Sequence, residues 1–310
     1  MNNHHFRSRR RFLQLMALGA GGFVSPGFAR DERLALLTRP VPSSGERLPL
    51  IGLGSSRTFN VGSDPQALDN VAEVMRYFFN AGGSVIDSSP MYGSAQPAIG
   101  YGLAKLKRTQ NVFSADKVWT WNANEGHEQI ERSRQHWKVK TFDLMQVHNL
   151  VEWPSHLATL QQMKKSGEIK YVGITTSHGR RHDEFVDIMK TQPLDFVQFT
   201  YNILDREAEQ VLLPLARKKG IAVIINRPFQ RGDLIDALET KPLPAWAGDI
   251  DCYSWPQFLL KFIVSHPDVT CAIPATSQVP HIKENMAAGY GALANKAMRK
   301  RMIDYVEKVI

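Results

Sequence analysis

Four titratable residues stand at or just after short apolar runs, and their side chains are suited to acid–base chemistry. Asp87 ends one run and Tyr92 follows it five residues later. Lys117 comes just after the next run, and His148 ends the one after that. A tyrosine hydroxyl is a weak acid because its ordinary pKa is near 10, and a lysine held beside it is expected to lower that pKa. With Asp87 fixing the lysine and His148 orienting the substrate, such a group can protonate a carbonyl oxygen while hydride reaches the carbon.

These side chains can meet only if the strands that carry them are neighbours in a parallel sheet. Eight apolar runs are separated by segments with apolar residues three and four apart, two of which end at Gly167 and Gly220. This alternation predicts an α/β fold, a single-domain (β/α)8 TIM barrel over residues 30–310, with catalytic groups at the C-terminal strand ends. The predicted strands are 48–53, 84–87, 111–115, 144–148, 171–174, 196–199, 222–226 and 270–273.

One segment interrupts the alternation. Residues 233–254 contain Pro242, Pro244 and Gly248 together with several charges. They are predicted to form a long loop, or a loop with a short helix, beside the functional end of the barrel. Loops of this length in a compact domain are usually functional or mobile.

Five short motifs keep their order and spacing over about residues 46–290. They are G-L-G at 52–54, V-I-D-S-S-P-M-Y-G-S at 85–94, L-M-Q-V-H-N at 144–149, Y-V-G-I at 171–174, and I-P-A-T-S at 273–277 with E-N at 284–285. Together these motifs resemble the aldo-keto reductase family. The resemblance implies a nicotinamide-dependent oxidoreductase that reduces an aldehyde or ketone, with Asp87, Tyr92, Lys117 and His148 as the catalytic tetrad and Tyr92 as the general acid. No metal site is expected.

The resemblance also implies where the nicotinamide binds. Family members hold its amide with a Ser-Asn pair and a glutamine, and this chain has Thr175, Thr176 and Gln198 at those places. An aromatic residue usually stacks on the ring, but Asn226 stands here. Stacking is therefore expected to be weaker or to come from another residue.

The adenosine end is expected at the segment after the last strand. Thr276, Ser277, Glu284 and Asn285 suit an adenosine dinucleotide, and Lys283 is the nearby cation expected at a 2′-phosphate. Because arginine is favoured for binding phosphate through two hydrogen bonds, its absence leaves both NADPH and NADH as candidate cofactors.

The substrate is expected to be a small carbonyl compound in an open pocket. Phe59, Met91, Trp119 and Asn149 are the candidate pocket residues. Arginines at 180, 181, 227 and 231 would attract acidic substrates if they face the pocket. The alternatives are a nicotinamide-binding subunit or scaffold without catalysis, and an unrelated barrel lyase or isomerase.

The first 29 residues resemble a twin-arginine signal peptide. S-R-R-R-F-L-Q at 8–14 is followed by a short apolar run at 12–24 and by Gly27-Phe28-Ala29, which suits a signal-peptidase site. The chain is therefore expected to be exported in folded form through the twin-arginine machinery to a bacterial periplasm. The run is too short and glycine-rich for stable membrane insertion. A disordered tail and an uncleaved anchor are the alternatives.

Composition excludes some functions. The net charge of +8 falls to +4 without the signal, and no motif that reads nucleic acid accompanies it. Cys252 and Cys271 are too few for a disulfide framework. They are expected to be free and buried, although an oxidising compartment would allow them to pair.

Overall fold

The structure, a computed structural model, describes residues 35–108 and 110–310. The expected export signal at residues 1–29 and the expected start of the barrel at residue 30 lie outside these ranges. Within them, no helix combines the length and apolar character needed to cross a membrane.

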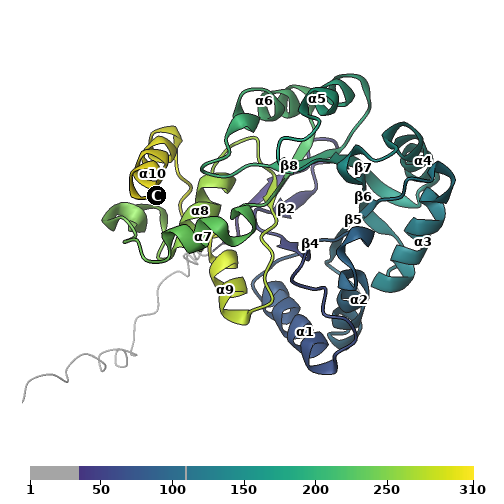
Figure 1. The fold of residues 1–310 in the computed structure, drawn as a ribbon, viewed down its shortest axis with the longest axis horizontal. Coiled ribbons are helices and arrows are strands. Elements are labelled where there is room, and N and C mark those ends of the chain that lie inside the picture. Colours follow the sequence, from purple (N-terminus) through teal and green to yellow (C-terminus); the bar gives the residue numbers. More distant parts are fainter. Residues whose placement is uncertain (1–34, 109) are drawn as a thin grey trace, which may run out of the picture. The chain divides into compact units, whose positions relative to one another are not determined.

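Eight parallel strands surrounded by helices form the body of the molecule (Figure 1). The strands pair in chain order, and parallel bridges from Ile51 to Ala272 and from Gly54 to Ala275 join the first to the last. The predicted (β/α)8 barrel is thus confirmed. Its strands are β3 (Leu53–Gly54), β4 (Val85–Asp87), β5 (Phe113–Val118), β6 (Phe142–Val147), β7 (Ile169–Thr175), β8 (Phe196–Thr200), β9 (Ala222–Asn226) and β10 (Cys271–Ala272).

The first predicted strand, residues 48–53, is divided between two structures. β2 (Arg47–Pro49) pairs antiparallel with β1 (Thr38–Pro40) in a hairpin, and only Leu53–Gly54 enters the barrel sheet. The other seven predicted strands overlap the observed ones. The hairpin contributes Val41 and Leu48 to a small core with the first residues of the barrel strands, such as Phe113. This core fills the amino-terminal end of the barrel and leaves the carboxyl-terminal end for polar groups.

The helices form where the sequence supplies caps and an apolar face. Asp64 accepts a hydrogen bond from the Ala67 backbone at the start of α1, and Pro65 occupies the first turn. α4 ends at Gly167, which has a φ of 82°. The helices are α1 (Pro65–Asn80), α2 (Ala95–Lys105), α3 (Gly126–Trp137), α4 (Trp153–Ser166), α5 (His182–Thr191), α6 (Leu212–Lys219), α7 (Asp233–Leu238), α8 (Trp255–Val264), α9 (Val279–Ala287) and α10 (Lys296–Val309).

The segment 233–254 contains the short helix α7 and a 3₁₀ helix, η7 (Ala245–Ile250). Leu234, Leu238 and Ile250 bury their side chains and hold the segment against the core. The prediction of a loop with a short helix is confirmed. Cys252 and Cys271 are both buried and free, as expected.

Candidate active site

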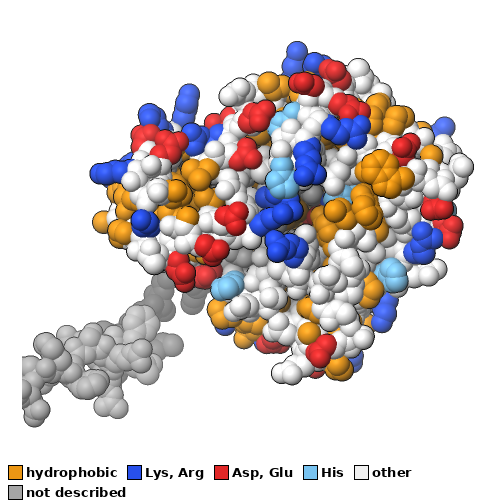
Figure 2. Space-filling view, viewed as in Figure 1, with side chains coloured by type: hydrophobic (Ala, Val, Ile, Leu, Met, Phe, Trp, Pro, Cys, Tyr) orange, Lys and Arg blue, Asp and Glu red, His pale blue; other side chains and the backbone are white. Residues whose placement is uncertain are grey.

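A cleft of about 1280 Å³ opens at the carboxyl-terminal ends of the strands. Gly54, Asp87, Thr175, Gln198 and Asn226 line it from β3, β4, β7, β8 and β9. Figure 2 shows this face hollowed near its middle, with Lys and Arg side chains gathered beside the hollow. The volume exceeds the roughly 300–1,000 Å³ of a typical small-molecule pocket, so a dinucleotide and a small substrate can both fit.

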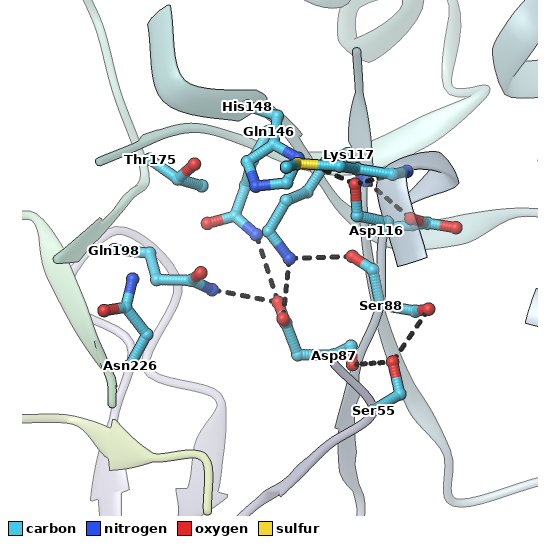
Figure 3. A network of polar contacts seen from close by, with 12 residues as sticks. Ser55, Asp87, Ser88, Asp116, Lys117, Gln146, His148, Thr175, Gln198 and Asn226 are labelled. Carbon is cyan, nitrogen blue, oxygen red and sulfur yellow. Dashed lines mark hydrogen bonds and ion pairs between the residues drawn. The ribbon is translucent and has the colours of Figure 1, made fainter. Parts of the chain in front are cut away.

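Lys117 and Asp87 form a buried ion pair at the base of this cleft (Figure 3). The Lys117 Nζ lies 2.6 Å from Asp87 Oδ1 and 2.7 Å from the Ser88 carbonyl oxygen. Burial alone would lower the pKa of Lys117, but Asp87 and Tyr92 outweigh it and raise that pKa. Lys117 therefore stays charged, and an ammonium with three N–H donors keeps one for another partner.

Tyr92 ends the 3₁₀ helix η2 (Pro90–Tyr92), just after β4, and lines the cleft. Its ring centroid lies 5.5 Å from the Lys117 Nζ. Burial raises the pKa of Tyr92, and the attraction of Lys117 opposes this rise without cancelling it. Lys117 thus lowers the pKa of Tyr92 as expected, but burial has the larger effect, so the net shift is upward. The phenol keeps its proton, which is the form that donates to a carbonyl oxygen.

His148 follows β6 and is fixed by a serine that the sequence analysis missed. The His148 Nδ1 lies 2.7 Å from the Ser89 Oγ, and that oxygen already accepts a hydrogen bond from the Met91 backbone N–H. The Ser89 hydroxyl hydrogen is thus available to donate to Nδ1. A ring that accepts at Nδ1 carries its hydrogen on Nε2, so His148 offers an N–H donor to the cleft.

His148 is also close to Tyr92 and uncharged. The two rings meet edge to face with centroids 5.6 Å apart. Burial, with a contribution from the charge of Lys117, lowers the pKa of His148 well below its ordinary value. A neutral imidazole can orient a carbonyl oxygen by hydrogen bonding without competing as the acid.

Amide side chains from two further strands complete the network around Asp87 (Figure 3). Gln198 Nε2 lies 2.9 Å, and Gln146 Nε2 3.5 Å, from Asp87 Oδ2. Asp116, beside Lys117, points away toward α2, where Gln96 donates to it at 2.7 Å. Burial raises the pKa of Asp116 to about 7. Sequence reasoning missed Gln146, although it lies in β6 two residues before His148, a spacing that puts side chains of an extended chain on the same side.

The residues predicted to bind the nicotinamide differ in whether their side chains keep a free hydrogen-bonding atom, and Gln198 and Thr175 both do. Gln198 uses its Nε2 on Asp87, which leaves its Oε1 as an acceptor. The Thr175 hydroxyl oxygen accepts from the Asn149 backbone at 3.1 Å and keeps its hydrogen to donate. One acceptor and one donor on paired residues of β7 and β8 match the amide of a nicotinamide, so these residues fit the cofactor.

Thr176 and Asn226 line the same cleft but are occupied by the protein. The Thr176 hydroxyl donates to the Arg180 carbonyl oxygen at 2.6 Å. Asn226 accepts from the Thr200 hydroxyl at 2.8 Å and donates to the Thr176 carbonyl oxygen at 2.9 Å. The hydrogen bond of Thr176 therefore does not support its predicted part in holding the nicotinamide amide. Asn226, which stands where a stacking residue is expected, uses its side chain within the protein.

At the adenosine end, four of the five predicted residues line the cleft: Thr276, Ser277, Glu284 and Asn285. Lys283 does not, and its Nζ lies 4.3 Å from the centroid of the Tyr77 ring on α1. Helical spacing turns Lys283 away from the face that Glu284 shares with His281, so this arrangement does not support the prediction that Lys283 meets a 2′-phosphate. His281 lines the cleft instead.

Two of the four predicted substrate-pocket residues lie in the cleft. Met91, 48% exposed, and Asn149 line it. Phe59 does not, because its side chain is fully buried in the core. Trp119 is also absent from the lining. Both of its backbone polar groups bond to the Gln129 side chain on α3, which holds Trp119 toward that helix.

Two known proteins of similar sequence are named methylglyoxal reductases. The chain is 25% identical over 248 residues to Methylglyoxal reductase YeaE of Escherichia coli, covering 77% of this chain and 85% of that protein. It is also 25% identical over 248 residues to the NADH-specific methylglyoxal reductase of Escherichia coli, covering 70% and 73%.

Solved structures share the fold. An aldo/keto reductase from Klebsiella pneumoniae in complex with NADP and acetate superposes with a TM-score of 0.72 at 21% identity, covering 84% of this chain and 93% of that one. The family model described as "Aldo/keto reductase family" matches residues 50–304. The chain therefore belongs to the aldo/keto reductase family and is a nicotinamide-dependent oxidoreductase.

Proposed function

We propose that the protein reduces an aldehyde or ketone to an alcohol, with Tyr92 as the general acid. The observation that carries this proposal is the buried Lys117–Asp87 ion pair, whose ammonium lies 5.5 Å from the centre of the Tyr92 ring, which in turn meets the His148 ring at 5.6 Å. A structural role alone does not require a phenol, an ammonium and an imidazole to converge at one cleft.

Each residue has a distinct part in the proposed reaction. His148 donates from Nε2 to the substrate oxygen and places it within reach of the Tyr92 hydroxyl. Tyr92 then passes its proton to that oxygen, and Lys117 stabilises the phenolate left behind with its remaining N–H donor. Asp87, held by Gln198 and Gln146, keeps Lys117 in position.

NADPH or NADH, when bound, supplies the hydride. On this proposal Thr175 and Gln198 hold the nicotinamide amide, and Ser277, Glu284 and Asn285 contact the adenosine end. Asn226 has no aromatic ring to stack on the nicotinamide, so its amide contacts carry more of the orientation unless an aromatic residue of the cleft such as Phe229 supplies the stacking. Because Lys283 is turned away, selection of NADPH over NADH would depend on His281.

The test is turnover of a purified sample with NADPH or NADH and 4-nitrobenzaldehyde, followed by loss of cofactor absorbance. Methylglyoxal is a second substrate to try, given the relatives' names. Replacing Tyr92 with phenylalanine should lower kcat by about 10²–10⁴, the usual contribution of a general acid, while NADPH still binds. Cofactor binding without turnover of any carbonyl would instead support a non-catalytic subunit or scaffold.

We also propose that the protein is exported through the twin-arginine pathway to a bacterial periplasm. The proposal depends on the basic, apolar and small-residue order of residues 8–29. Replacing Arg9 and Arg10 with lysine should keep the protein in the cytoplasm, as cell fractionation would show. Unchanged export of that variant would contradict the proposal.

A further inference from the structure

Four arginines gather where the loops after three strands meet at the cleft. Arg57 follows β3, Arg180 follows β7, and Arg227 and Arg231 follow β9. Arg57, Arg227 and Arg231 line the cleft. Arg180 lies near enough to Arg227 to act on its charge. These four residues are called the arginine group below.

The charges of the arginine group are not neutralised by the protein. Among residues 35–108 and 110–310, no carboxylate lies within 4.0 Å of their guanidinium nitrogens. The adjoining Arg181, by contrast, bonds Glu184 with its Nη2 at 2.7 Å. Burial lowers the pKa of Arg227 to about 10, and repulsion by the other arginines adds to this shift. Grouped like charges destabilise a protein unless an anion binds.

The backbone is in an unusual conformation at three of these four residues. Arg57, Arg227 and Arg231 have φ angles of 66°, 50° and 70°. This left-handed region is uncommon for residues other than glycine, and strain of this kind concentrates at functional sites. Three arginines on two separate loops are thus presented to the cleft at a cost in backbone energy.

Arg227 brings part of the positive charge of the arginine group close to Tyr92. Arg227 and Tyr92 line the same cleft, and each acts electrostatically on the other. A dinucleotide diphosphate carries two negative charges, fewer than the four positive charges of the group, and the 2′-phosphate of NADPH is expected at the adenosine end near His281. A diphosphate bound to the group therefore leaves positive charge beside the phenol, where the carbonyl must lie.

We propose that the carbonyl substrate carries an anionic group, a carboxylate or a phosphate ester, which binds the arginine group while its carbonyl lies at Tyr92. Guanidinium groups bind such oxyanions through paired hydrogen bonds. The inference depends on the proposed carbonyl reduction and adds the class of substrate.

The test compares two aldehydes that differ mainly in charge, 4-carboxybenzaldehyde and 4-formylbenzamide. With NADPH, the wild-type enzyme should show a kcat/KM for the acid at least about tenfold above that for the amide, as expected for one charge-assisted contact. Arg227→Gln and Arg231→Gln should each reduce this ratio toward one. Arg132→Gln is the control, because Arg132 pairs with Glu128 on the surface of α3 and its loss changes the net charge equally.

The results of this comparison distinguish a substrate anion from a cofactor phosphate as the ligand of the arginine group. Equal kcat/KM values for the two aldehydes in the wild type overturn the inference but leave the proposed reduction intact. No turnover of either aldehyde removes the reduction and the inference with it. Arg227→Gln or Arg231→Gln could instead weaken NADPH binding in a fluorescence titration and leave the ratio of the two kcat/KM values unchanged. That result would show that the arginine group binds cofactor phosphate, and it would also overturn the inference.

A measurement on the wild type does not depend on how the variants fold. Inorganic phosphate should inhibit reduction of 4-formylbenzamide competitively, whereas chloride at equal ionic strength should not. Inhibition that is competitive with NADPH instead of the aldehyde contradicts the inference.

Discussion

The cleft has two regions that differ in whether their charged side chains are paired with an opposite charge. Around Asp87 and Lys117, the charges are buried, paired and held by amide side chains. In the arginine group, the charges lie on loops and have no carboxylate partner among the described residues. The first region is complete without a ligand, whereas the second lacks counter-charge until an anion binds.

The difference shows that the residues that react and the residues that select the ligand lie on different parts of this barrel. Strand ends and the turn after β4 hydrogen-bond Lys117 to Asp87 and place Tyr92 and His148 beside them, which pre-organises proton transfer. Loops carry the groups that select the ligand, as is usual for this fold. Replacing one member of the Lys117–Asp87 pair should therefore lower both the stability and the activity. Replacing one residue of the arginine group should mainly change which ligand binds.

The largest effect is expected from Lys117→Met. It leaves the Asp87 carboxylate buried and unpaired, and removal of one partner of a buried ion pair costs about 3–5 kcal/mol. Without the ammonium, kcat should also fall by about 10²–10⁴. Urea unfolding and steady-state kinetics measure the two effects. Retention of most activity in a folded Lys117→Met variant would contradict the role given to this region.

A smaller effect is expected from Ser89→Ala, because Ser89 acts only through His148. Losing the hydroxyl that bonds Nδ1 frees the imidazole to change tautomer, so kcat should fall by about tenfold, the equivalent of one hydrogen bond. KM should change less, and Ser89→Thr should restore part of kcat.

The matched control is Ser133→Ala, which removes another buried serine hydroxyl, one that bonds Gln96 instead of His148. Equal losses of kcat in the two alanine variants would show that Ser89 has only a packing role.

The smallest effect is expected on the stability of Arg231→Gln. Because the protein without ligand holds unpaired like charges there, their partial removal should leave the free energy of unfolding unchanged or raise it by up to about 0.5 kcal/mol. Low-salt urea unfolding checks this. Destabilisation by more than about 1 kcal/mol would mean that Arg231 supports the fold and would remove the contrast between the two regions.

The sequence alone predicts the reacting centre because strand ends obey simple rules. Asp87, Lys117 and His148 end or follow neighbouring parallel strands, and such ends converge at one rim of a barrel. Tyr92 follows Asp87 closely enough that a single turn brings it to the same rim. No long-range detail of packing is needed for these four residues.

The predictions that the structure does not support concern properties that depend on the direction or burial of a side chain. Phe59 and Trp119 leave strand ends on loops, and one enters the core while the other is held toward α3. Lys283 is displaced by helical geometry, which its spacing from Glu284 could have indicated. The pKa of Tyr92 depends on a balance between burial and the charge of Lys117 that no residue pattern reveals.

The identity of the proton donor is tested most directly by the pH dependence of single-turnover reduction with bound NADPH. Burial raises the pKa of Tyr92, so its protonated form persists at and above neutral pH, and the rate should stay level until pH exceeds the ordinary tyrosine value of about 10. His148 stays neutral at these pH values, because its pKa lies well below its ordinary value. A rate that instead falls near pH 6.5, the ordinary pKa of histidine, would identify the imidazolium as the acid and contradict the role of Tyr92.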